Sequence, residues 1–399
     1  MSTLPDYAQA LSAALGTVRA LHQTERIALS DATGRVLAQP VSADRDLPPF
    51  NRSQMDGFAV RAEEIGTRYS FEVVGKIAAG RPANVSVPIG ACVKIATGAP
   101  LPDDLDTVIQ HEHSDRSNPV HFTVESVERG HAVHPRGADA RAGDVLLTPP
   151  MMLEAHHLGI AAAVGCVDPE VYAQPRTAVL SSGDEVRPIA SDVQRHEIRQ
   201  SNAPMVEAIV KRFGATVVMT EHIADEPDAT IEAVGRALES CDLVITIGGI
   251  SAGERDLFPL AFDHFGVQTA LRGAAIQPGR PIYVGSVNGG ASVIGLPGNP
   301  VSSLVCANLF VRPVIGRMLR LSELNRWRTV TLADSVKPNP KRQAFRPARL
   351  CNDGDSVVVP SWAGSGDLVH TAGTHGIVAL PVQNEPVEAG ARLRFLSWW

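Results

Sequence analysis

The sequence predicts a multidomain α/β protein whose central part is a three-layer domain built on a parallel β-sheet. Two observations support this fold class. Residues 173–322 alternate short apolar runs with amphipathic helical patterns, and polar, glycine-containing loops follow three of the apolar runs. Strands that alternate with helices form a parallel sheet with helices on both faces, and such sheets bind ligands at the carboxyl ends of their strands. Because 399 residues exceed one ordinary core, we expect further domains on both sides.

The N-terminal part predicts a helical segment. Pro5 is suited to a helix start, and Leu11, Leu15 and Val18 follow at helical spacing. We expect a second, shorter helix that starts at Ser30 or Asp31 and runs through Leu37, and a third over residues 151–165. The helical segment is therefore assigned to residues 1–45 and 148–172.

Residues 46–147 predict a small β domain inserted into this helical segment. Prolines in the first five of these residues exclude helix and central strand there. Short β-like runs separated by Gly, Pro, Asn and Asp turns then occur at residues 71–77, 92–96, 107–111 and 121–127.

The α/β domain at residues 173–322 contains the strongest patterns. We expect strands at 178–180, 216–219, 243–247 and 292–294, and helices at 203–213 and 229–238. Residues 327–399 predict a second small β domain, with short strands at 329–333, 356–360, 376–381 and 392–396.

Composition excludes several classes of protein. A hydrophobic content of 44% with 20% charged residues is typical of a globular domain, and a net charge of −7 argues against nucleic-acid binding through a broad basic surface. The five cysteines are odd in number and widely spaced, as in a reducing compartment. Neither a signal pattern nor an apolar run of about 18 residues is evident, so we expect a cytoplasmic protein without a membrane partner.

The loop at residues 248–256 (GGISAGERD) directly follows an apolar strand and indicates phosphate chemistry. Gly248 and Gly249 let backbone amides approach a ligand, although a glycine pair can also be only a tight turn. Glu254 and Asp256 would repel a phosphate unless a divalent cation bridges them or the phosphate reacts. Two more polar loops, at residues 181–185 and 296–303, are expected at the same edge of the sheet.

Other polar residues have both a functional and a structural interpretation. Asn299 and Pro300 suit any helix start, yet a helix start also offers amides to an anion. Arg280 suits an oxyanion but could be a solvated side chain. His111 and His113 are expected on one face of a strand, and without a third ligand nearby we do not expect a zinc site.

Eight motifs, in their order along the chain, resemble the molybdopterin molybdenumtransferase family, which includes the gephyrin E domain. They are PPFNRSQMDGFAV (48–60), ATGAPLP (96–102), RGADARAGDVLL (136–147), SSGDE (181–185), GGISAGERD (248–256), QPGRP (277–281), LPGNPVSS (296–303) and GSGDL (364–368). The resemblance implies an elongated four-domain fold, dimerisation through the helical segment and molybdopterin binding by residues 173–322. It also implies a homodimer whose active sites lie between the subunits.

The implied reaction inserts molybdate into adenylylated molybdopterin, releases AMP and forms molybdenum cofactor, with Mg²⁺ and with molybdopterin adenylyltransferase as substrate donor. Carried onto matching positions, the acidic active-site set is Asp56, Asp139, Glu185, Asp225 and Asp256. Of these, Glu185 and Asp256 are the expected metal ligands. Contacts to the pterin phosphate, nucleotide or oxyanion are expected from Thr97, Gly248, Gly249, Ser251, Gly253, Pro278, Gly279, Arg280, Pro281, Gly298, Asn299, Ser302, Arg346 and Ser365.

The sequence departs from the family pattern at two places. The family usually has lysine where Gln277 stands. Its RxEFxR pattern reads here as residues 342–347, with Ala344 in the place of the acid, Pro347 in the place of the second arginine and Arg346 shifted by one. The alternative function is therefore a divergent paralogue that binds pterin or acts as a scaffold without full transferase activity. An adenylyl-transferring enzyme shares the GGxSxG loop but is normally a lone α/β domain, so the additional domains argue against it.

Overall fold

The structure is a computed structural model that describes residues 4–250, 256–322 and 325–398. The chain divides into two compact units. The first unit comprises Met1–Ala38, Pro149–Glu154 and Glu170–Trp399, and the second comprises Gln39–Thr148 and Ala155–Pro169. Each unit has its own hydrophobic core.

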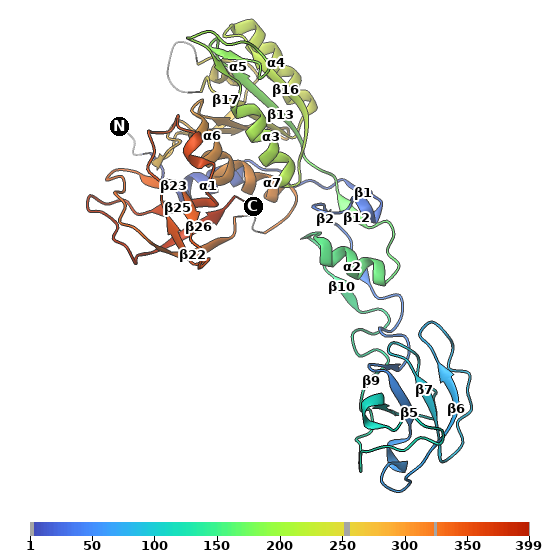
Figure 1. Ribbon diagram of the computed structural model, residues 1–399. Coiled ribbons are helices and arrows are strands. Elements are labelled where there is room, and N and C mark those ends of the chain that lie inside the picture. Colours follow the sequence, from blue (N-terminus) through green and yellow to red (C-terminus); the bar gives the residue numbers. More distant parts are fainter. Residues whose placement is uncertain (1–3, 251–255, 323–324, 399) are drawn as a thin grey trace. The chain divides into compact units, whose positions relative to one another are not determined.

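A six-stranded sheet forms the centre of the first unit (Figure 1). Its strands, in spatial order, are β16 (Thr216–Ile223), β13 (Arg176–Ser182), β17 (Leu243–Ile247), β21 (Ser292–Leu296), β20 (Tyr283–Ser286) and β18 (Gln268–Arg272). The first four strands are parallel, whereas β20 and β18 are antiparallel to their neighbours. The multidomain α/β fold class is confirmed, and the four predicted strands are the four parallel ones, whereas β20 and β18 are additional strands that the sequence pattern did not indicate. A short turn joins β20 to β21, and such a turn can connect only antiparallel strands.

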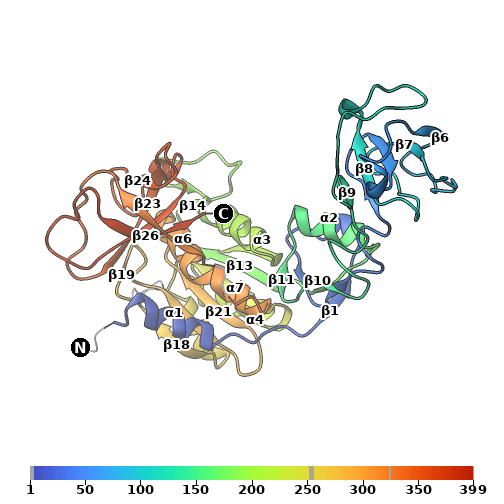
Figure 2. The ribbon, with the colours of Figure 1, turned by 90° about the horizontal axis from the view of Figure 1, so that it is seen from below.

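Helices cover both faces of this sheet and create the expected three layers (Figures 1 and 2). One face packs against α4 (Pro227–Ser240) and α5 (Phe258–His264). The other face packs against α1 (Tyr7–Gly16), α3 (Asn202–Arg212) and a continuous helix. This continuous helix consists of α6 (Pro300–Cys306), the π-helical turn η4 (Ala307–Val311) and α7 (Arg312–Met318). Strand β17 serves both cores, because Leu243, Ile245 and Ile247 face the second set of helices and Val244 faces the first. The helices predicted at residues 203–213 and 229–238 are confirmed as α3 and α4.

The helix at residues 300–318 is long and apolar enough to cross a membrane by length and composition alone. Its most apolar window is 89% buried inside the protein, and a core helix passes the same test. Its apolar composition is therefore explained by its central position in the first unit.

A closed β-barrel ends the first unit. Its strands are β22 (Trp327–Leu332), β23 (Gln343–Leu350), β24 (Ser356–Val358), β25 (Gly376–Leu380) and β26 (Arg392–Ser397), and the pairing of β23 with β25 closes the ring. The four runs expected in this region are confirmed as strands, whereas β23 is an additional one. Strand β19 (Ile276–Gln277) leaves the α/β part and pairs in parallel with β23, which joins the barrel to the loop after β19.

The remaining strands of the first unit are short. A four-stranded sheet contains β1 (Thr24–Arg26), β12 (Glu170–Tyr172), β2 (Val36–Leu37) and β11 (Met151–Met152), and a parallel pair contains β14 (Val186–Arg187) and β15 (Ile198–Arg199). The helix expected from Ser30 or Asp31 through Leu37 is wrong. A 3-10 turn at Leu29–Asp31 precedes β2, because Val36 and Leu37 are buried by pairing with β11 and β12.

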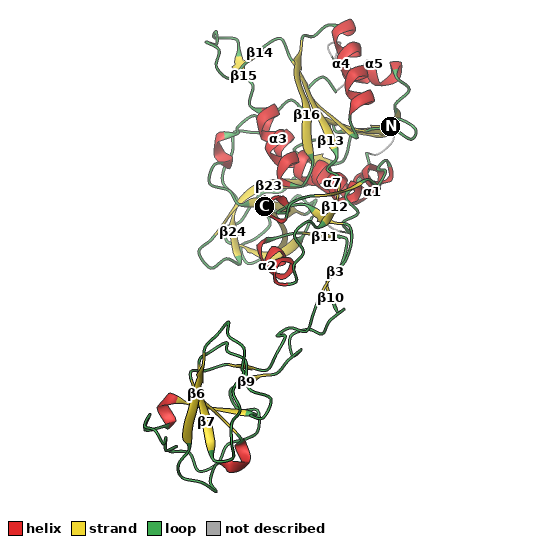
Figure 3. Ribbon diagram, turned by 90° about the vertical axis from the view of Figure 1, so that its right-hand side faces the viewer, coloured by secondary structure: helices red, strands yellow, loops and turns green. Residues whose placement is uncertain are grey.

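The second unit consists mainly of strands and loops (Figure 3). A four-stranded sheet has the order β6 (Glu72–Ile77), β7 (Ala91–Ile95), β5 (Gly57–Val60) and β8 (Thr107–Gln110), and two smaller pairs join β4 (Arg52–Ser53) to β9 (Val133–His134) and β3 (Val41–Ser42) to β10 (Val145–Leu147). Its helix, α2 (Ala155–Ala163), starts later than the expected residue 151, because residues 151–152 form β11.

Two expectations for the second unit are wrong. Residues 121–127 form no regular strand, and Phe122 instead packs against Phe58 and Phe71. His111 and His113 lie in a 3-10 turn after β8 rather than on a strand.

Candidate functional site

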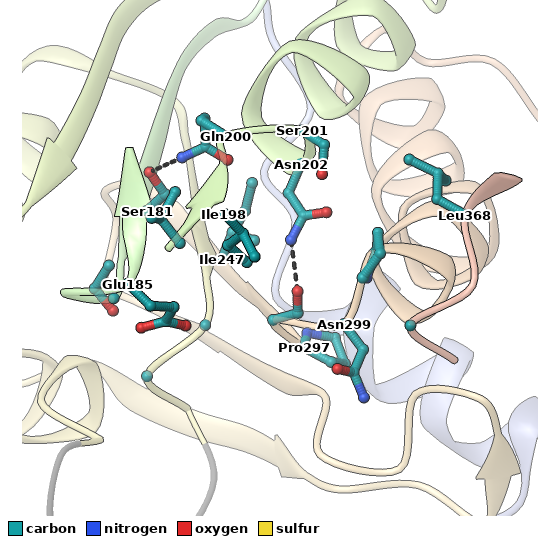
Figure 4. Close-up of a pocket in the computed structure, with 18 of the residues that line it drawn as sticks. Ser181, Glu185, Ile198, Gln200, Ser201, Asn202, Ile247, Pro297, Asn299 and Leu368 are labelled. Atoms are coloured by element: carbon teal, nitrogen blue, oxygen red, sulfur yellow. Dashed lines mark hydrogen bonds between the residues drawn. The ribbon is translucent and has the colours of Figure 1, made fainter. Parts of the chain in front are cut away.

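The carboxyl ends of the parallel strands border a cavity of about 850 Å³ in the first unit. The loops after β13, β16, β17 and β21 contribute Glu185, Asp225, Gly248 and Asn299 to its wall. Figure 4 shows Glu185 and Ser181 on one side of the cavity, and Pro297 and Asn299 on another. The strand-end loops thus meet at one place, as expected of a parallel sheet.

The loop that follows β17 approaches its neighbours closely. A Cβ atom on Gly249 would lie 2.9 Å from Oγ of Ser182 and 3.0 Å from the ring of Phe258, and the φ angle of Gly249 is +58°. A larger residue would therefore be strained there, because L-residues rarely adopt positive φ. Gly248 is beside it in the cavity wall, whereas Ser251 and Gly253 lie outside the described residues.

Four carboxylates line this cavity, which we call the acidic cavity. Glu185, Asp225 and Asp256 belong to the predicted set, and Asp367 comes from the C-terminal barrel. The backbone amide of Ala363 donates to Asp367 at 3.1 Å and lowers the pKa of that carboxyl group. Asp367 is therefore charged at neutral pH and adds to the negative potential of the cavity.

A network of hydrogen-bonded polar groups fixes one side of the acidic cavity. Gln200 Nε2 donates to Ser181 Oγ at 2.8 Å (Figure 4). Ser181 Oγ also lies 3.0 Å from His222 Nδ1. Asn202 Nδ2 donates to the Gly298 carbonyl at 2.6 Å, while Asn202 Oδ1 is buried and has no protein partner. A ligand donor could satisfy this oxygen, because a buried polar atom without a partner is costly.

A second cavity of about 470 Å³ adjoins the first. Pro281, Pro297 and Asn299 line both cavities. The other residues of the second wall include two arginines, two serines and one tryptophan, namely Arg280, Arg342, Ser302, Ser365 and Trp362, together with Gln277, Pro278 and Gly279. We call it the arginine cavity.

The pairing of β19 with β23 explains how Arg342 reaches the arginine cavity. Gln277 lies opposite Ala344 in this ladder, so the start of the barrel strand is beside the loop that carries Arg280. Gln277 Oε1 accepts a hydrogen bond from Asn339 Nδ2 at 2.7 Å, and Asn339 Oδ1 accepts from the amide of Arg342 at 3.0 Å. Arg342 thus supplies a second cation near the position where the family pattern has lysine.

Asn299 joins the barrel to the strand-end loops. It occupies the N-cap position of α6, but its side chain makes no capping hydrogen bond and instead donates from Nδ2 to Ser365 Oγ at 2.8 Å. The amide of Val301 also donates to the Ser365 carbonyl at 3.0 Å. These bonds hold the GSGDL segment against the start of α6.

Arg346 lies behind the wall of the arginine cavity and does not line it. Its guanidinium carbon is 4.1 Å from the centre of the Trp362 ring, and Nη2 donates to the Pro360 carbonyl at 3.4 Å. Burial lowers the pKa of Arg346 to about 10. The shift of one residue relative to the family pattern therefore places this cation against an aromatic ring.

The remaining predicted residues lie in the second unit. The amide of Thr97 donates to Asp56 Oδ1 at 2.8 Å and lowers the pKa of Asp56. Asp139 Oδ1 lies 2.8 Å from His134 Nε2. Asp56 and Asp139 are both exposed, so both carboxylates are accessible in this unit.

The two cavities differ in charge and therefore in the ligands they suit. The acidic cavity has four carboxylates and one exposed cation, Arg199, in its wall, whereas the described residues of the arginine cavity include two arginines and no acid. Among the described residues, no three His, Cys, Asp or Glu side chains are placed to hold a metal ion by themselves. The first cavity suits a cation that also binds a ligand phosphate, and the second suits an anion.

The sequence did not indicate Asp367, Gln200, Asn202 or Trp362 as site residues. The GSGDL motif contained Asp367 without suggesting a role for it. Gln200 and Asn202 follow β15, and no local pattern shows that this segment lies beside the ends of β13 and β21.

Comparison with known proteins identifies the family. Three family models match consecutive parts of the chain: the MoeA N-terminal region (domain I and II) at residues 6–165, a probable molybdopterin binding domain at 178–317, and the MoeA C-terminal region (domain IV) at 329–398. A molybdopterin molybdenumtransferase from Nostoc sp. is 32% identical over 92% of this chain and 87% of its own length, and one from Synechocystis sp. is 32% identical over 92% and 93%.

Solved structures agree with this assignment. A crystal structure of a molybdopterin biosynthesis MoeA protein from Pyrococcus horikoshii has a TM-score of 0.80 at 26% identity, covering 100% of both chains. Another from the same organism has a TM-score of 0.86 at 24% identity, covering 99% of this chain and 100% of that one, and supports the fold. The resemblance seen in the motifs is thus confirmed, and the chain belongs to the molybdopterin molybdenumtransferase family of molybdenum cofactor biosynthesis enzymes.

Proposed function

We propose that this protein inserts molybdate into adenylylated molybdopterin, releasing AMP and forming molybdenum cofactor. The observation that carries the proposal is the pair of adjoining cavities with opposite charge, which share Pro281, Pro297 and Asn299. A substrate with a pyrophosphate link and an incoming oxyanion needs both environments, since its phosphates require a bridging cation and the oxyanion requires fixed donors.

The arginine cavity would bind molybdate. Arg280 and Arg342 offer charged donors, and the Ser302 and Ser365 hydroxyl groups offer neutral ones. Ser302 is buried, so its hydroxyl group is screened little by solvent. Arg342 stands at the first arginine of the family's RxEFxR pattern, so the cavity keeps two cations although Gln277 replaces the lysine, and this favours the transferase over a pterin-binding or scaffold role.

The acidic cavity would bind the pyrophosphate and nucleotide together with Mg²⁺. Glu185 and Asp256 would hold the cation, which fits because Mg²⁺ usually takes one or two carboxylates plus phosphate and water ligands rather than a complete protein cage. When bound, the cation would neutralise phosphate charge and so ease departure of AMP. Backbone amides at Gly248 and Gly249 and the free Asn202 oxygen would orient the rest of the substrate.

Asp56, Thr97 and Asp139 require a further proposal, because they lie in the second unit. We propose a homodimer in which these residues complete the active site of the other subunit. Their support is that the family-like motifs of the second unit, at residues 48–60 and 136–147, lie together and carry exposed carboxylates, with Arg136 N donating to Asn51 Oδ1 at 2.8 Å. Supply of the substrate by molybdopterin adenylyltransferase and a cytoplasmic location belong to the same proposal.

Release of AMP from adenylylated molybdopterin, measured with and without molybdate, tests the proposed function. We expect release that depends on both molybdate and Mg²⁺. Asp256→Asn should lower turnover by orders of magnitude without loss of folding, since a loop carboxylate contributes little to a core. Asp263→Asn, an exposed acid on α5 outside both cavities, is the matched control. Substrate binding without molybdate-dependent AMP release would favour the scaffold alternative instead.

A further inference from the structure

We propose that Trp362 is a stacking platform for the pterin ring of the substrate, and that Arg346 and His370 are positioning residues that hold its indole ring. The inference rests on the proposed function, because a flat heteroaromatic ring is expected here only if the substrate is a pterin. It assigns the pterin to the arginine cavity and the nucleotide to the acidic cavity.

Trp362 offers a flat aromatic surface, which the other residues described in the walls of the two cavities do not. Among the described residues that line the two cavities, it is the one aromatic side chain. A cavity of about 470 Å³ is large enough for a bicyclic ring beside a small oxyanion. Aromatic side chains bind flat heterocycles by stacking, which is tolerant of the pattern of ring nitrogens.

Arg346 covers one face of the indole. Its guanidinium carbon lies 4.1 Å from the ring centre, and its bond to the Pro360 carbonyl fixes the chain two residues before Trp362. No carboxylate pairs with Arg346 within the described part of the chain, and its buried Nε has no hydrogen-bond partner. A half-buried cation with no carboxylate partner loses part of its hydration without ionic compensation, so its contact with the ring calls for an explanation beyond stability.

This arrangement determines what Trp362 can offer to a ligand. Because the guanidinium occupies one face, the part of the indole that borders the cavity is the opposite face or the ring edge. A cation behind the ring draws its electron density away from the cavity side. The cavity side then suits an electron-rich ring or one that carries phosphate and thiolate groups, as a molybdopterin does.

The imidazole ring of His370 also packs against the indole. The two ring centroids are 5.6 Å apart, and the His370 side chain is 7% exposed, with Nδ1 against the Asp367 carbonyl. Asp367 itself lines the acidic cavity. Trp362 and the acidic cavity are therefore linked through one short segment, which would fix the position of the pterin ring relative to the pyrophosphate.

Binding of pterin-6-carboxylate and of AMP, each measured by calorimetry with Mg²⁺ on the full-length protein, tests this assignment. Trp362→Ala should weaken pterin binding about tenfold or more, a loss typical of a stacked base, whereas Trp362→Phe should restore most of it. Arg346→Met should weaken pterin binding about threefold, because the ring loses its support. None of these variants should change AMP binding. Arg394→Met is the matched control, because Arg394 stacks on Trp327 at 4.7 Å in the same barrel, outside both cavities.

Each other outcome is informative. Loss of AMP affinity with unchanged pterin affinity would mean that Trp362 stacks on adenine, and would overturn the assignment. Equal pterin affinity in the wild type and in Trp362→Ala would also overturn it. A wild-type protein that binds AMP but no pterin contradicts this inference alone, whereas one that binds neither ligand contradicts the proposed function itself.

Discussion

Gln277 gives the sharpest test of where the oxyanion binds. Its half-buried side chain lines the arginine cavity beside Arg280 and Arg342, and its Oε1 accepts a hydrogen bond from Asn339. Gln277→Lys should add a third cation to this wall. A charge-assisted bond to an oxyanion is worth about 1.5 to 3 kcal/mol, so molybdate should bind about tenfold or more tightly.

The same substitution should cost stability in the absence of ligand. A lysine cannot accept the bond from Asn339 Nδ2, and a typical hydrogen bond contributes about 1 kcal/mol. Repulsion from the two neighbouring arginines adds to this cost, and the bound anion relieves it. Gln277→Lys should therefore melt at a lower temperature than the wild type without molybdate and gain more from adding it.

Two variants at the same position separate charge from hydrogen bonding. Gln277→Met loses the bond to Asn339 without adding charge, so it should be destabilised but bind molybdate as the wild type does. Gln277→Glu keeps an acceptor for Asn339 and adds a negative charge, so it should bind molybdate more weakly. Calorimetric titration with molybdate gives the affinities, and thermal unfolding gives the stabilities. If the lysine, methionine and glutamate variants bind molybdate equally, the anion does not lie beside residue 277 and the arginine cavity is not its site.

Packing, acid stability and subunit assembly can each be tested by a substitution. Gly279→Ala should destabilise the first unit by about 2 kcal/mol or more, because the φ angle of Gly279 is +102° and a Cβ atom would overlap the Cys306 sulfur. An unchanged melting temperature would contradict the close packing of this loop. Backbone amides lower the pKa of Asp115 in the second unit, so its contribution to stability is present above about pH 4 and is lost as the pH falls further. Asp115→Asn should therefore flatten the decline of melting temperature with acid, and a parallel decline would refute this role. Mixed Asp56→Asn and Asp256→Asn chains should regain activity through one intact composite site, whereas no rescue in verified heterodimers would place the site within one chain.

The parts of the fold that could be predicted are those with a strong local period. Helix α4 shows a clear apolar stripe, and β17 is a run of five buried residues, four of them apolar and one the β-branched Thr246, so both could be located from the sequence. Strand β23 could not, because Arg346 and Pro347 interrupt its apolar pattern. Its strand conformation depends on pairing with β19, β24 and β25, which lie far away along the chain.

The residues of the candidate site also divide into those that the sequence could indicate and those that it could not. Glu185, Asp225 and Asp256 follow strands of one sheet, and the topology of a parallel sheet brings such loops together without further information. Arg342 and Trp362 enter the site from the barrel, and only the long-range β19–β23 ladder shows that they reach the loop of Arg280. Residues contributed by another part of the chain have no local signature.

The neutral wall between the two cavities follows from their opposite charges. A carboxylate on the wall that the two cavities share would lie within a few ångströms of the oxyanion and would repel it strongly where the dielectric constant is low. The shared wall consists of two prolines and Asn299, none of which carries charge. Asn299 is held by Ser365, whose own segment continues to Asp367 in the acidic cavity. The barrel therefore contributes to both cavities and also fixes the uncharged boundary between them, which allows one substrate to extend from a cation-binding environment into an anion-binding one.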